Sequence, residues 1–445
     1  MLSGRLIDMV TGTVLSGVTI QIDGKSVQTD AQGRYVLGDL ACGVHEVYVS
    51  VNGFDTYKRS VDISSGGWLD IRLTNEKTTN GLVSESAIYG DPVNTATGNY
   101  VYQHRDLDIP GIGLSFQFDR TYNSRDAGNG PLGYGWSHNF NTHLRAENGN
   151  VTITWGDGHT ETWVSDGQGG FSNQYGVFDT LIGDGGVYTL RKKNRMAYQF
   201  DVTGNLVSIT DKNGNSQTLT YTSGKLTQIT DTAGRSFTLA YDLSNRLVQI
   251  TDPIDRTVGY TYDANGDLVT VTDPNKNQTH YTYDANHQML TIVGPRGNTV
   301  VNNTYDADKR VVTYQTDAKG GATTYDYQEL DRITTITDAL GNITLHQHDD
   351  LLRLIKEVDP NGGVSLYEYD ALGNRIRVTD KNGNVTQYDY DIRGNVTKKI
   401  DALGNVTIIT YDGQDNPLSR TDALENTTTF SYDQYLRQTG GKFIG

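Results

Sequence analysis

The sequence has little of what holds a small secreted domain together or anchors a chain in a membrane. It contains a single cysteine, Cys42, which excludes an internal disulfide, and we expect this thiol to be buried and structural. No apolar run approaches the roughly 18 residues that a membrane span requires. The N-terminus also lacks the cationic and apolar stretches of a signal peptide. The sequence therefore predicts a chain with no disulfide, no signal peptide and no membrane span.

Positive charge is scarce as well. The 445 residues include 37 Lys and Arg against 53 Asp and Glu, which gives a formal net charge of −16. A nucleic-acid binder needs a cationic surface that displaces counterions from the phosphates. We therefore expect no nucleic-acid partner.

Proline is rare, whereas glycine and tyrosine are abundant, with 8, 50 and 28 residues respectively. Glycine permits turns with positive φ, and tyrosine favours half-buried strand positions. This composition predicts many short strands joined by tight turns, and it disfavours long helices and coiled coils.

A step of tyrosine followed by aspartate recurs through the second half of the chain. Degenerate copies at Tyr327–Gln328 and His348–Asp349 fill the one long gap, and the series extends back to Phe200, which gives twelve registers spaced by 20 to 22 residues. A second landmark, typically threonine followed by aspartate as in Thr272–Asp273, lies about ten residues after each tyrosine, and such phased self-similarity is the signature of a repeat protein. The repeat-defining residues are Tyr241, Asp242, Tyr262, Asp263, Tyr283, Asp284, Tyr305, Asp306, Tyr369, Asp370, Tyr390, Asp391, Tyr411, Asp412, Tyr432 and Asp433.

Each repeat predicts two short strands and two tight turns. Segments rich in Asp, Asn and Gly, such as 212–215 and 263–266, follow the two landmarks and favour hairpins. The residue two positions before the repeat tyrosine is usually apolar, as at Tyr260 and Tyr281, so both side chains share one strand face, which we expect to be the core side. Open sheets rarely exceed about ten strands without curling. We therefore predict an all-β protein in which a long ribbon of hairpins coils.

Three other regions are predicted around this ribbon. Residues 1–75 show six or seven short alternating strands, which is typical of a β-sandwich. A polar linker is expected at 76–89, followed by a β-rich domain at 90–190 and the repeats at 191–440.

The repeat resembles the YD repeat of RHS (rearrangement hotspot) proteins, on the order Gly373–Asn374, Thr379–Asp380, Gly383–Asn384 and Tyr388 to Asp391. Residues 90–139 resemble the β-rich domain of unknown function that precedes these repeats in bacterial polymorphic toxins. Residues 1–75 resemble a carboxypeptidase regulatory-like domain, which is a prealbumin-like sandwich. The resemblance implies a hollow shell of hairpins that encloses a C-terminal toxin or effector. No toxin domain or terminal core motif precedes Gly445, so we expect the chain to be truncated before its passenger.

Several residues invite a chemical role, and each also has a structural explanation. Asp-x-Asn-Gly segments such as 211–215 resemble fragments of calcium loops, but they lack the downstream bidentate Glu and are in phase with the repeat, so turns are favoured. His346 and His348 share a strand face, and because His348 occupies the place of the repeat tyrosine, we expect packed rings rather than metal ligands. Trp155 and Trp163 flank a hairpin and could stack on a sugar, although burial is favoured.

We predict a non-enzymatic scaffold with no catalytic residue, cofactor or metal. Its expected partners are a C-terminal toxin or effector polypeptide and secretion machinery, in a protein that is secreted or lies at the surface of a bacterial cell. The alternative is an adhesion protein that binds a cell-surface glycan through exposed tyrosines. A glycan hydrolase ranks third, because the repeating aspartates are explained by turns.

Overall fold

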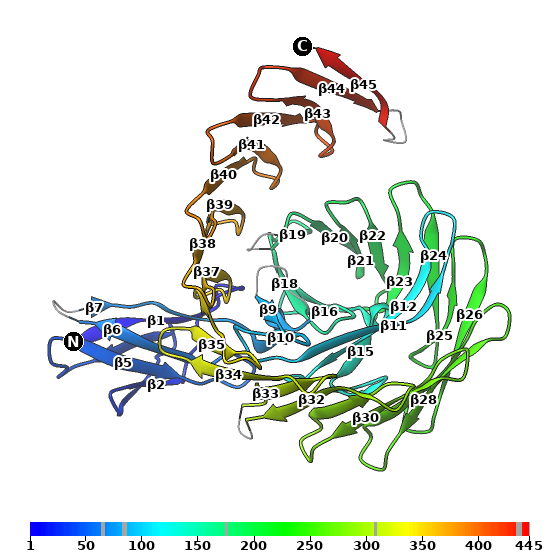
Figure 1. Ribbon diagram of the computed structural model, residues 1–445, viewed down its shortest axis with the longest axis horizontal. Helices are drawn as coiled ribbons and strands as arrows, with labels where there is room; N and C mark the ends of the chain where they lie inside the picture. The colour runs from blue at the N-terminus through cyan, green and yellow to red at the C-terminus, as the bar shows by residue number, and fades with distance from the viewer. Residues whose placement is uncertain (64–66, 82–86, 174–176, 307–308, 433–437, 445) are drawn as a thin grey trace. The chain divides into compact units, whose positions relative to one another are not determined.

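The computed structural model describes residues 1–445 except 64–66, 82–86, 174–176, 307–308, 433–437 and 445. The regular secondary structure of the described residues is almost entirely β-strand (Figure 1), and its helical elements are two short 3-10 helices, η1 (Glu76–Thr79) and η2 (Asn139–Asn141). None of the helices in the described ranges has the length and apolar character needed to cross a membrane. The all-β prediction is confirmed.

The chain folds into two compact units, each assembled from segments that are distant in sequence. The first consists of Met1–Asp108, Gln117–Val164 and Phe237–Leu354, and the second consists of Ile109–Phe116, Ser165–Ser236 and Ile355–Gly445.

The first unit begins with a sandwich of two small sheets around an apolar core that includes Leu6, Ile20, Val47 and Ile71. Alternate residues of each strand point into this core, as the period of two predicts. One sheet contains β1 (Leu2–Asp8), β4 (Arg34–Leu37), β7 (Gly67–Trp68) and β8 (Ile71–Leu73), and the other contains β2 (Thr19–Ile22), β3 (Lys25–Gln28), β5 (Val44–Val49) and β6 (Tyr57–Asp62).

The expectation of a buried thiol is wrong. Cys42 is exposed, in the loop between β4 and β5. The strands that flank this loop already fill the core with larger apolar side chains, and the loop itself runs over the surface.

Short strands follow the sandwich. β11, β12 and β15 form a three-stranded sheet, and β16 to β18 form an antiparallel meander. Their bounds are β9 (Ile88–Tyr89), β10 (Val93–Asn94), β11 (Val101–Ile109), β12 (Phe116–Asn123), β13 (Asn129–Gly130), β14 (Gly133–Tyr134), β15 (Trp136–His138), β16 (His143–Glu147), β17 (Asn150–Thr154) and β18 (Thr160–Ser165).

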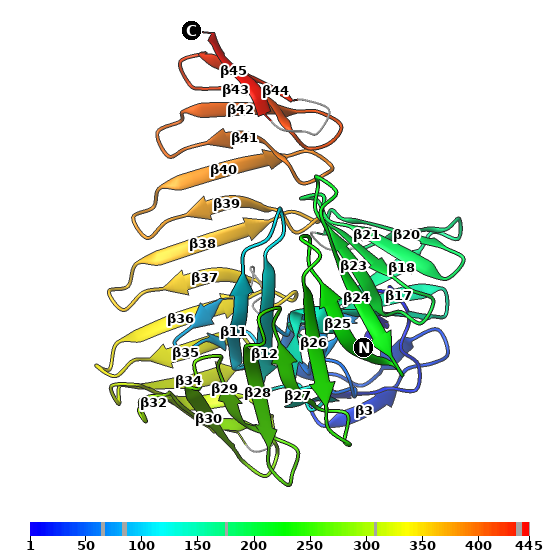
Figure 2. The ribbon, with the colours of Figure 1, turned by 90° about the vertical axis from the view of Figure 1, so that its right-hand side faces the viewer.

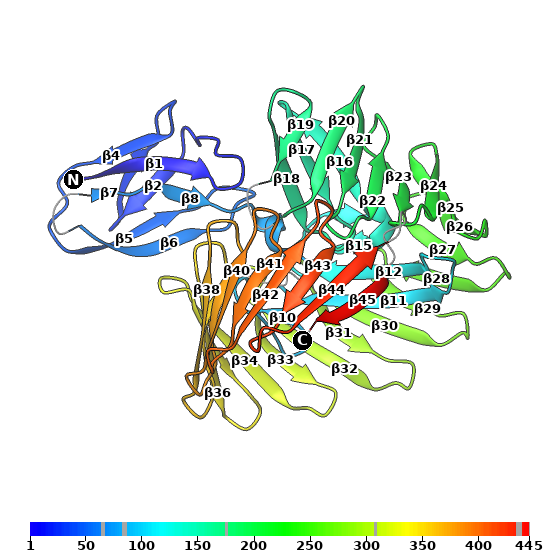
Figure 3. The same ribbon diagram turned by 90° about the horizontal axis from the view of Figure 1, so that it is seen from above.

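The hairpins of the first unit run from β26 to β36, and each strand pairs antiparallel with the next, as between β28 and β29. Figure 3 shows this succession in green and yellow. The strands are β26 (Ser236–Tyr241), β27 (Leu247–Thr251), β28 (Thr257–Tyr262), β29 (Leu268–Thr272), β30 (Gln278–Tyr283), β31 (Met289–Val293), β32 (Thr299–Tyr305), β33 (Val312–Asp317), β34 (Ala322–Gln328), β35 (Ile333–Thr337) and β36 (Ile343–His348).

The second unit contains two runs of the same kind, and Figure 2 shows the later run as a regular stack in yellow, orange and red. The earlier run is β19 (Gly170–Ser172), β20 (Thr180–Asp184), β21 (Val187–Arg191), β22 (Ala197–Phe200), β23 (Leu206–Thr210), β24 (Ser216–Thr222) and β25 (Lys225–Thr230). The later run is β37 (Leu354–Val358), β38 (Val364–Tyr369), β39 (Arg375–Thr379), β40 (Val385–Tyr390), β41 (Val396–Ile400), β42 (Val406–Tyr411), β43 (Pro417–Thr421), β44 (Thr427–Tyr432) and β45 (Gln438–Ile444).

Candidate functional site: the hairpin repeat and the segment packed on it

The repeating aspartates organise the turns. In the turn 211–215, one carboxylate oxygen of Asp211 accepts hydrogen bonds from the backbone N–H of Asn213 at 2.8 Å and of Asn215 at 2.9 Å. The side-chain amide of Asn215 donates to the other oxygen at 2.7 Å. Gly214, with φ of 85°, supplies the left-handed fourth position that a side chain would strain. The same arrangement recurs after both landmarks, for example in 380–384 and 412–416.

These hydrogen bonds within the turn explain why aspartate recurs at this position of the repeat. Burial alone would favour the neutral acid, but the bonds from Asn215 hold the pKa of Asp211 below its usual value. Where arginine replaces the last asparagine, as at Arg256, its guanidinium donates to Asp252 at 2.7 Å in the same place. The carboxylates are therefore already engaged by turn donors, which supports turns over calcium loops at these positions. Across the described ranges, no group of three or more His, Cys, Asp or Glu side chains is placed to hold a metal ion.

The repeat tyrosine has a different task, at the bulge that ends each hairpin strand. The pairing of β28 with β29 shifts register between Thr261 and Tyr262, and a bulge of this kind disrupts the local ladder of backbone hydrogen bonds. The hydroxyl of Tyr262 donates to the carbonyl of Leu247, the first residue of β27, at 2.6 Å. A tyrosine in this place therefore satisfies a backbone acceptor that a phenylalanine would leave without this bond.

This hydrogen bond accounts for the length of the repeat. Tyr262 lies opposite Leu268, the first residue of the following strand, and the carbonyl of Leu268 in turn accepts from Tyr283 at 2.8 Å. The next tyrosine must therefore stand 21 residues on. Equivalent bonds join Tyr221 to Leu206, Tyr305 to Met289, Tyr327 to Val312, Tyr390 to Arg375, Tyr411 to Val396 and Tyr432 to Pro417.

Replacing Tyr262 by phenylalanine is expected to lower the free energy of unfolding by about 1 to 2 kcal/mol, because a largely buried carbonyl loses its donor. Chemical denaturation followed by tryptophan fluorescence measures this change. The matched control is Tyr314→Phe, since Tyr314 is exposed and the substitution should change stability little. Equal effects of the two substitutions would contradict this role of the hydroxyl.

The predicted repeat residues thus take places in the turns and at the bulges. Asp242, Asp370, Asp391 and Asp412 each accept from the backbone two and four residues on. Asp263 and Asp284 do the same. Asp306 accepts from the N–H of Lys309 in a longer turn. Tyr241 and Tyr369 end β26 and β38, and Asp433 lies outside the described residues.

Tyr260, Tyr281 and Tyr325 form a row of rings, the aromatic ladder, on one face of the first-unit hairpins, and residues 89–108 and 117–140 of the same unit cover this face. Tyr260, Tyr281 and Tyr325 are 4%, 2% and 3% exposed. Each hydroxyl bonds to these residues: Tyr260 donates to Asp106 at 2.8 Å, Tyr281 accepts from Arg120 at 2.8 Å, and Tyr325 donates to the carbonyl of Tyr89 at 3.3 Å. The expectation that this face is a core side is confirmed here, because the β-rich segment packs on it.

A buried ion pair is at the centre of this contact. Arg120 of β12 and Asp106 of β11 have side chains that are 1% and 2% exposed, and the guanidinium Nε lies 2.9 Å from both carboxylate oxygens. The guanidinium also lies over the ring of Trp136, 4.8 Å from its centroid. Burial favours the neutral acid, but Arg120 and the donors His104 and Tyr260 hold the pKa of Asp106 below its usual value.

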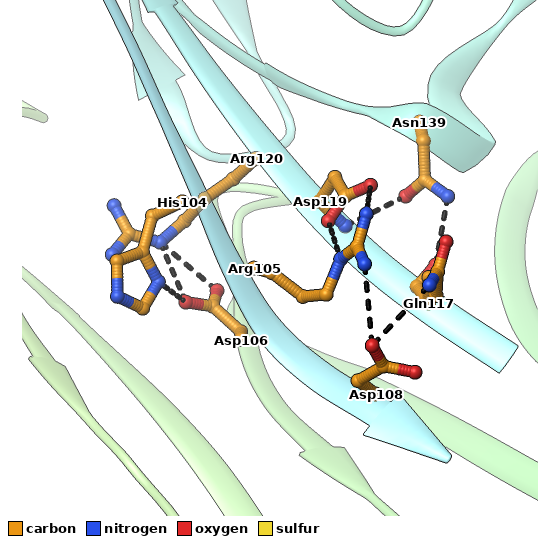
Figure 4. A network of polar contacts seen from close by, with 8 residues as sticks. All are labelled: His104, Arg105, Asp106, Asp108, Gln117, Asp119, Arg120 and Asn139. Carbon is orange, nitrogen blue, oxygen red and sulfur yellow. Dashed lines mark hydrogen bonds and ion pairs between the residues drawn. The ribbon is translucent and has the colours of Figure 1, made fainter. Parts of the chain in front are cut away.

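Figure 4 shows this pair beside a second, more exposed set of charges on the same two strands. Arg105 bonds to both oxygens of Asp119, at 2.7 and 3.1 Å, and to Asp108 at 3.2 Å. Gln117 also donates to Asp108, at 3.3 Å. Exposed pairs contribute little to stability, so the buried pair is the one that fixes these strands against the hairpins.

Where the sequence departs from the repeat, the hairpins contact other parts of the first unit. At one ladder position Asn303 replaces tyrosine, and its side-chain oxygen accepts a hydrogen bond from the side-chain amide of Gln315 at 2.9 Å. Gln315 also exchanges two hydrogen bonds with the backbone of Asp91, at 2.6 and 3.0 Å. At the next degenerate turn, Asp350 forms an ion pair with Arg59 of the sandwich. Positions at which the sequence departs from the repeat are therefore positions whose side chains contact segments outside the hairpins.

His346 and His348 are packed rings, as expected. They are 5% and 4% exposed, and the hydroxyl of Thr95 lies 2.9 Å from Nδ1 of His346 and 3.3 Å from Nε2 of His348. Burial lowers their pKa values to about 4 and about 3. Both rings are therefore neutral at pH 7, inside the contact between the hairpins and the upstream segment.

Burial of the tryptophan pair is also confirmed, since Trp155 and Trp163 are 8% and 1% exposed. Trp155 stacks on His159, with ring centroids 5.8 Å apart. Their faces are not available to stack on a sugar.

Sequence reasoning missed Arg120 and Asp106. The signal was present, because Arg120 alternates with Phe118 and Tyr122 along one strand and thus occupies a core-facing position. A charge at such a position requires a buried partner, but the sequence does not show which carboxylate provides it.

Three family models match the chain. The model described as RHS Repeat matches seven times, over residues 200–299, 305–343 and 348–406. These residues are RHS repeats by sequence match. Upstream of these RHS repeats, a domain of unknown function (DUF6531) matches residues 90–163, and a carboxypeptidase regulatory-like domain matches residues 1–74. The segment that covers the RHS ladder is therefore the domain of unknown function.

The chain is also similar to individual proteins. It is 30% identical over 130 residues to the tRNA nuclease WapA of Bacillus subtilis (strain 168), which covers 29% of this chain and 6% of that protein. Among solved structures, a TcdB2–TccC3 crystal structure shares 10% identity over 94% of this chain and 27% of that chain, with a TM-score of 0.38. A Photorhabdus luminescens Tc holotoxin pore shares 12% identity over 77% and 26% of the respective chains, with a TM-score of 0.36. The chain spans a small part of each of these relatives.

Proposed function

We propose that the chain is a non-enzymatic scaffold, part of an RHS-type hairpin shell that encapsulates a C-terminal toxin or effector polypeptide. One observation carries the proposal: the ladder face of the first-unit hairpins is covered by polypeptide, namely residues 89–108 and 117–140 of the same unit. The recurring side chains are used within the fold, with carboxylates in the turns and hydroxyls at the bulges. A wall built in this way can exclude solvent and proteases from a passenger without recognising its sequence.

The location and partners follow from the same proposal. A protein that carries a toxin must leave the cell that makes it, so we place it outside or on the surface of a bacterium, with secretion machinery as a partner. The adhesin alternative depends on exposed tyrosines, and the ladder tyrosines of the first unit are buried. Glycan stacking on that ladder therefore lacks a surface.

Limited proteolysis of the full-length gene product tests encapsulation. We expect its C-terminal domain to survive a protease concentration that degrades the same domain expressed alone, and electron microscopy to show a hollow particle. Equal degradation of the enclosed and the isolated domain, or a solid rod in the images, would refute the proposal. The control combines Tyr281→Phe with Tyr260→Phe, which weakens the covered ladder while leaving the passenger's own sequence unchanged.

A further inference from the structure

The ladder face changes character in the second unit. In the first unit, one position of the repeat is occupied by Val271, Ile292 and Ile336, which are 5%, 1% and 0% exposed. In the later run of the second unit the same position holds Lys399 and Arg420, and both are exposed. Two consecutive repeats have thus exchanged an aliphatic core residue for a cation.

Aromatic and apolar side chains accompany these cations. The strand registers place Lys399 opposite Tyr388 and Arg420 opposite Ile409, so each pair shares a face. Nζ of Lys399 lies 5.9 Å from the centroid of the Tyr388 ring. Phe430 continues the series on β44, and Tyr388, Ile409 and Phe430 are only half-buried. We define the basic aromatic face as Tyr388, Lys399, Ile409, Arg420 and Phe430.

The basic aromatic face contains no carboxylate of its own. Along the described strands β40 to β44 the acidic side chain is Asp389, and the register places it opposite Lys398, on the other face of the sheet. Lys398 lies 3.8 Å from Asp389, whereas the neighbouring Lys399 points to the opposite side. The strands therefore pair the cation on one face with a carboxylate. Lys399 and Arg420 on the ladder face have no carboxylate on these strands, and among the described residues only the charges of the turn residues Asp401 and Asp422 act on them.

The first unit shows what covers such a position. There the ladder face is covered by extended strands, and the buried guanidinium of Arg120 on one of them is matched by Asp106. Covering Lys399 and Arg420 would likewise require carboxylates, because an unpaired buried cation is costly. The spacing of the two cations, two strands apart along the sheet, is about 10 Å.

We propose that the basic aromatic face binds an extended, acidic polypeptide segment, with carboxylates on Lys399 and Arg420 and apolar side chains on Tyr388, Ile409 and Phe430. The inference rests on the proposed function for the source of that segment, which would be the passenger, but its chemistry follows from the face alone. It goes beyond encapsulation without recognition, because it gives one part of the wall a preference for acidic sequence.

Fluorescence anisotropy with the whole 445-residue chain tests the inference. The probe is a labelled peptide in which every second residue is in turn Glu and Leu, with Ser between them, so that both side chains lie on one face of the extended chain. The comparison peptides carry Gln or Lys in place of Glu. The variant is Lys399→Gln with Arg420→Gln, at exposed positions where folding should be preserved. Lys398→Gln, on the same strand and opposite face, is the matched control.

We expect the acidic peptide to bind. The two substitutions should lower its affinity about three- to tenfold, as the loss of two partly exposed charge pairs implies. Added salt should weaken binding in the same way, and Lys398→Gln should leave the affinity unchanged. Absence of binding, equal binding of the Gln peptide, an equal effect of Lys398→Gln, or a preference for single-stranded RNA or for a second copy of the chain would overturn the inference. Protection of the passenger in the full-length protein together with any of these results would refute this inference and leave the proposed function standing.

Discussion

Replacing Asp106 by asparagine is expected to destabilise the protein by about 3 to 5 kcal/mol, because it leaves the guanidinium of Arg120 buried without its counter-charge. Arg120 is 1% exposed and cannot reach water without separating β12 from the hairpins. The guanidinium also contacts the hydroxyl and ring of Tyr281 and the rings of Trp136 and Tyr102. None of these groups carries a full negative charge, so none replaces the carboxylate.

The measurement is a double-mutant cycle by urea denaturation. Asp106→Leu combined with Arg120→Met replaces the pair by apolar side chains, and we expect the double variant to recover more than half of the stability that either single change removes. Strict additivity of the two changes would show that the pair is not coupled. Arg105→Gln is the surface control, because Arg105 and Asp119 are 43% and 35% exposed and such pairs contribute less than about 1 kcal/mol.

The sequence was sufficient to predict the hairpins because their causes are local. Asp211 and Asn215 of one turn satisfy each other's backbone, and Tyr262 reaches an acceptor 15 residues earlier on the adjacent strand. Contacts of this range repeat with the sequence, so their period shows directly in the printed residues. The bonds of Tyr262 and its equivalents also explain why the landmark is tyrosine, which the pattern alone could not show.

What lies on the ladder could not be predicted, since it depends on contacts between residues more than a hundred positions apart. Arg120 meets Tyr281, and Asp91 meets Gln315. The sequence signals such contacts only as irregularities: a charge among core-facing residues at Arg120, or a missing tyrosine at Asn303 and His348. Each irregularity shows that a position differs from its repeat, but not which segment accounts for the difference. The assembly of each compact unit from distant segments is of the same kind.

Acidification is expected to unfold the protein between about pH 4 and pH 5, through three buried histidines. Burial lowers the pKa of His138 to about 3, of His346 to about 4 and of His348 to about 3, against about 6.5 in an unfolded chain. Above pH 6.5 these rings are neutral in both states and contribute no pH dependence. As the pH falls below 6.5, the unfolded chain takes up protons that the folded chain refuses, so stability is lost until the folded pKa values are reached.

The size of the effect follows from the shifts. Below the unfolded pKa each histidine removes stability at a rate that approaches about 1.4 kcal/mol per pH unit, so the three together remove about 5 kcal/mol between pH 6.5 and pH 5, which is comparable to the whole stability of a typical domain. His159 does not add to this slope. Burial disfavours its charge, but bonds to Asp157 and Glu161 raise its pKa to about 9, so it is protonated in both states below pH 6.5. Asp91 and Asp267, whose pKa values burial raises, act in the opposite direction and reduce the slope.

His138→Phe isolates one of the three contributions. His138 stacks on Phe118 with ring centroids 4.8 Å apart, and its Nδ1 has no hydrogen-bond partner among the described residues, so phenylalanine can occupy the site without loss of a bond. We expect the variant to lose stability with falling pH about one third less steeply, as measured by urea denaturation from pH 7 to pH 5. His143→Gln, at an exposed position, should reproduce the slope of the unmodified protein. If His138→Phe also left the slope unchanged, the acid sensitivity would have to come from other groups, whereas a reduced slope would show that the packing of His138 on Phe118 is stable only while the imidazole is neutral.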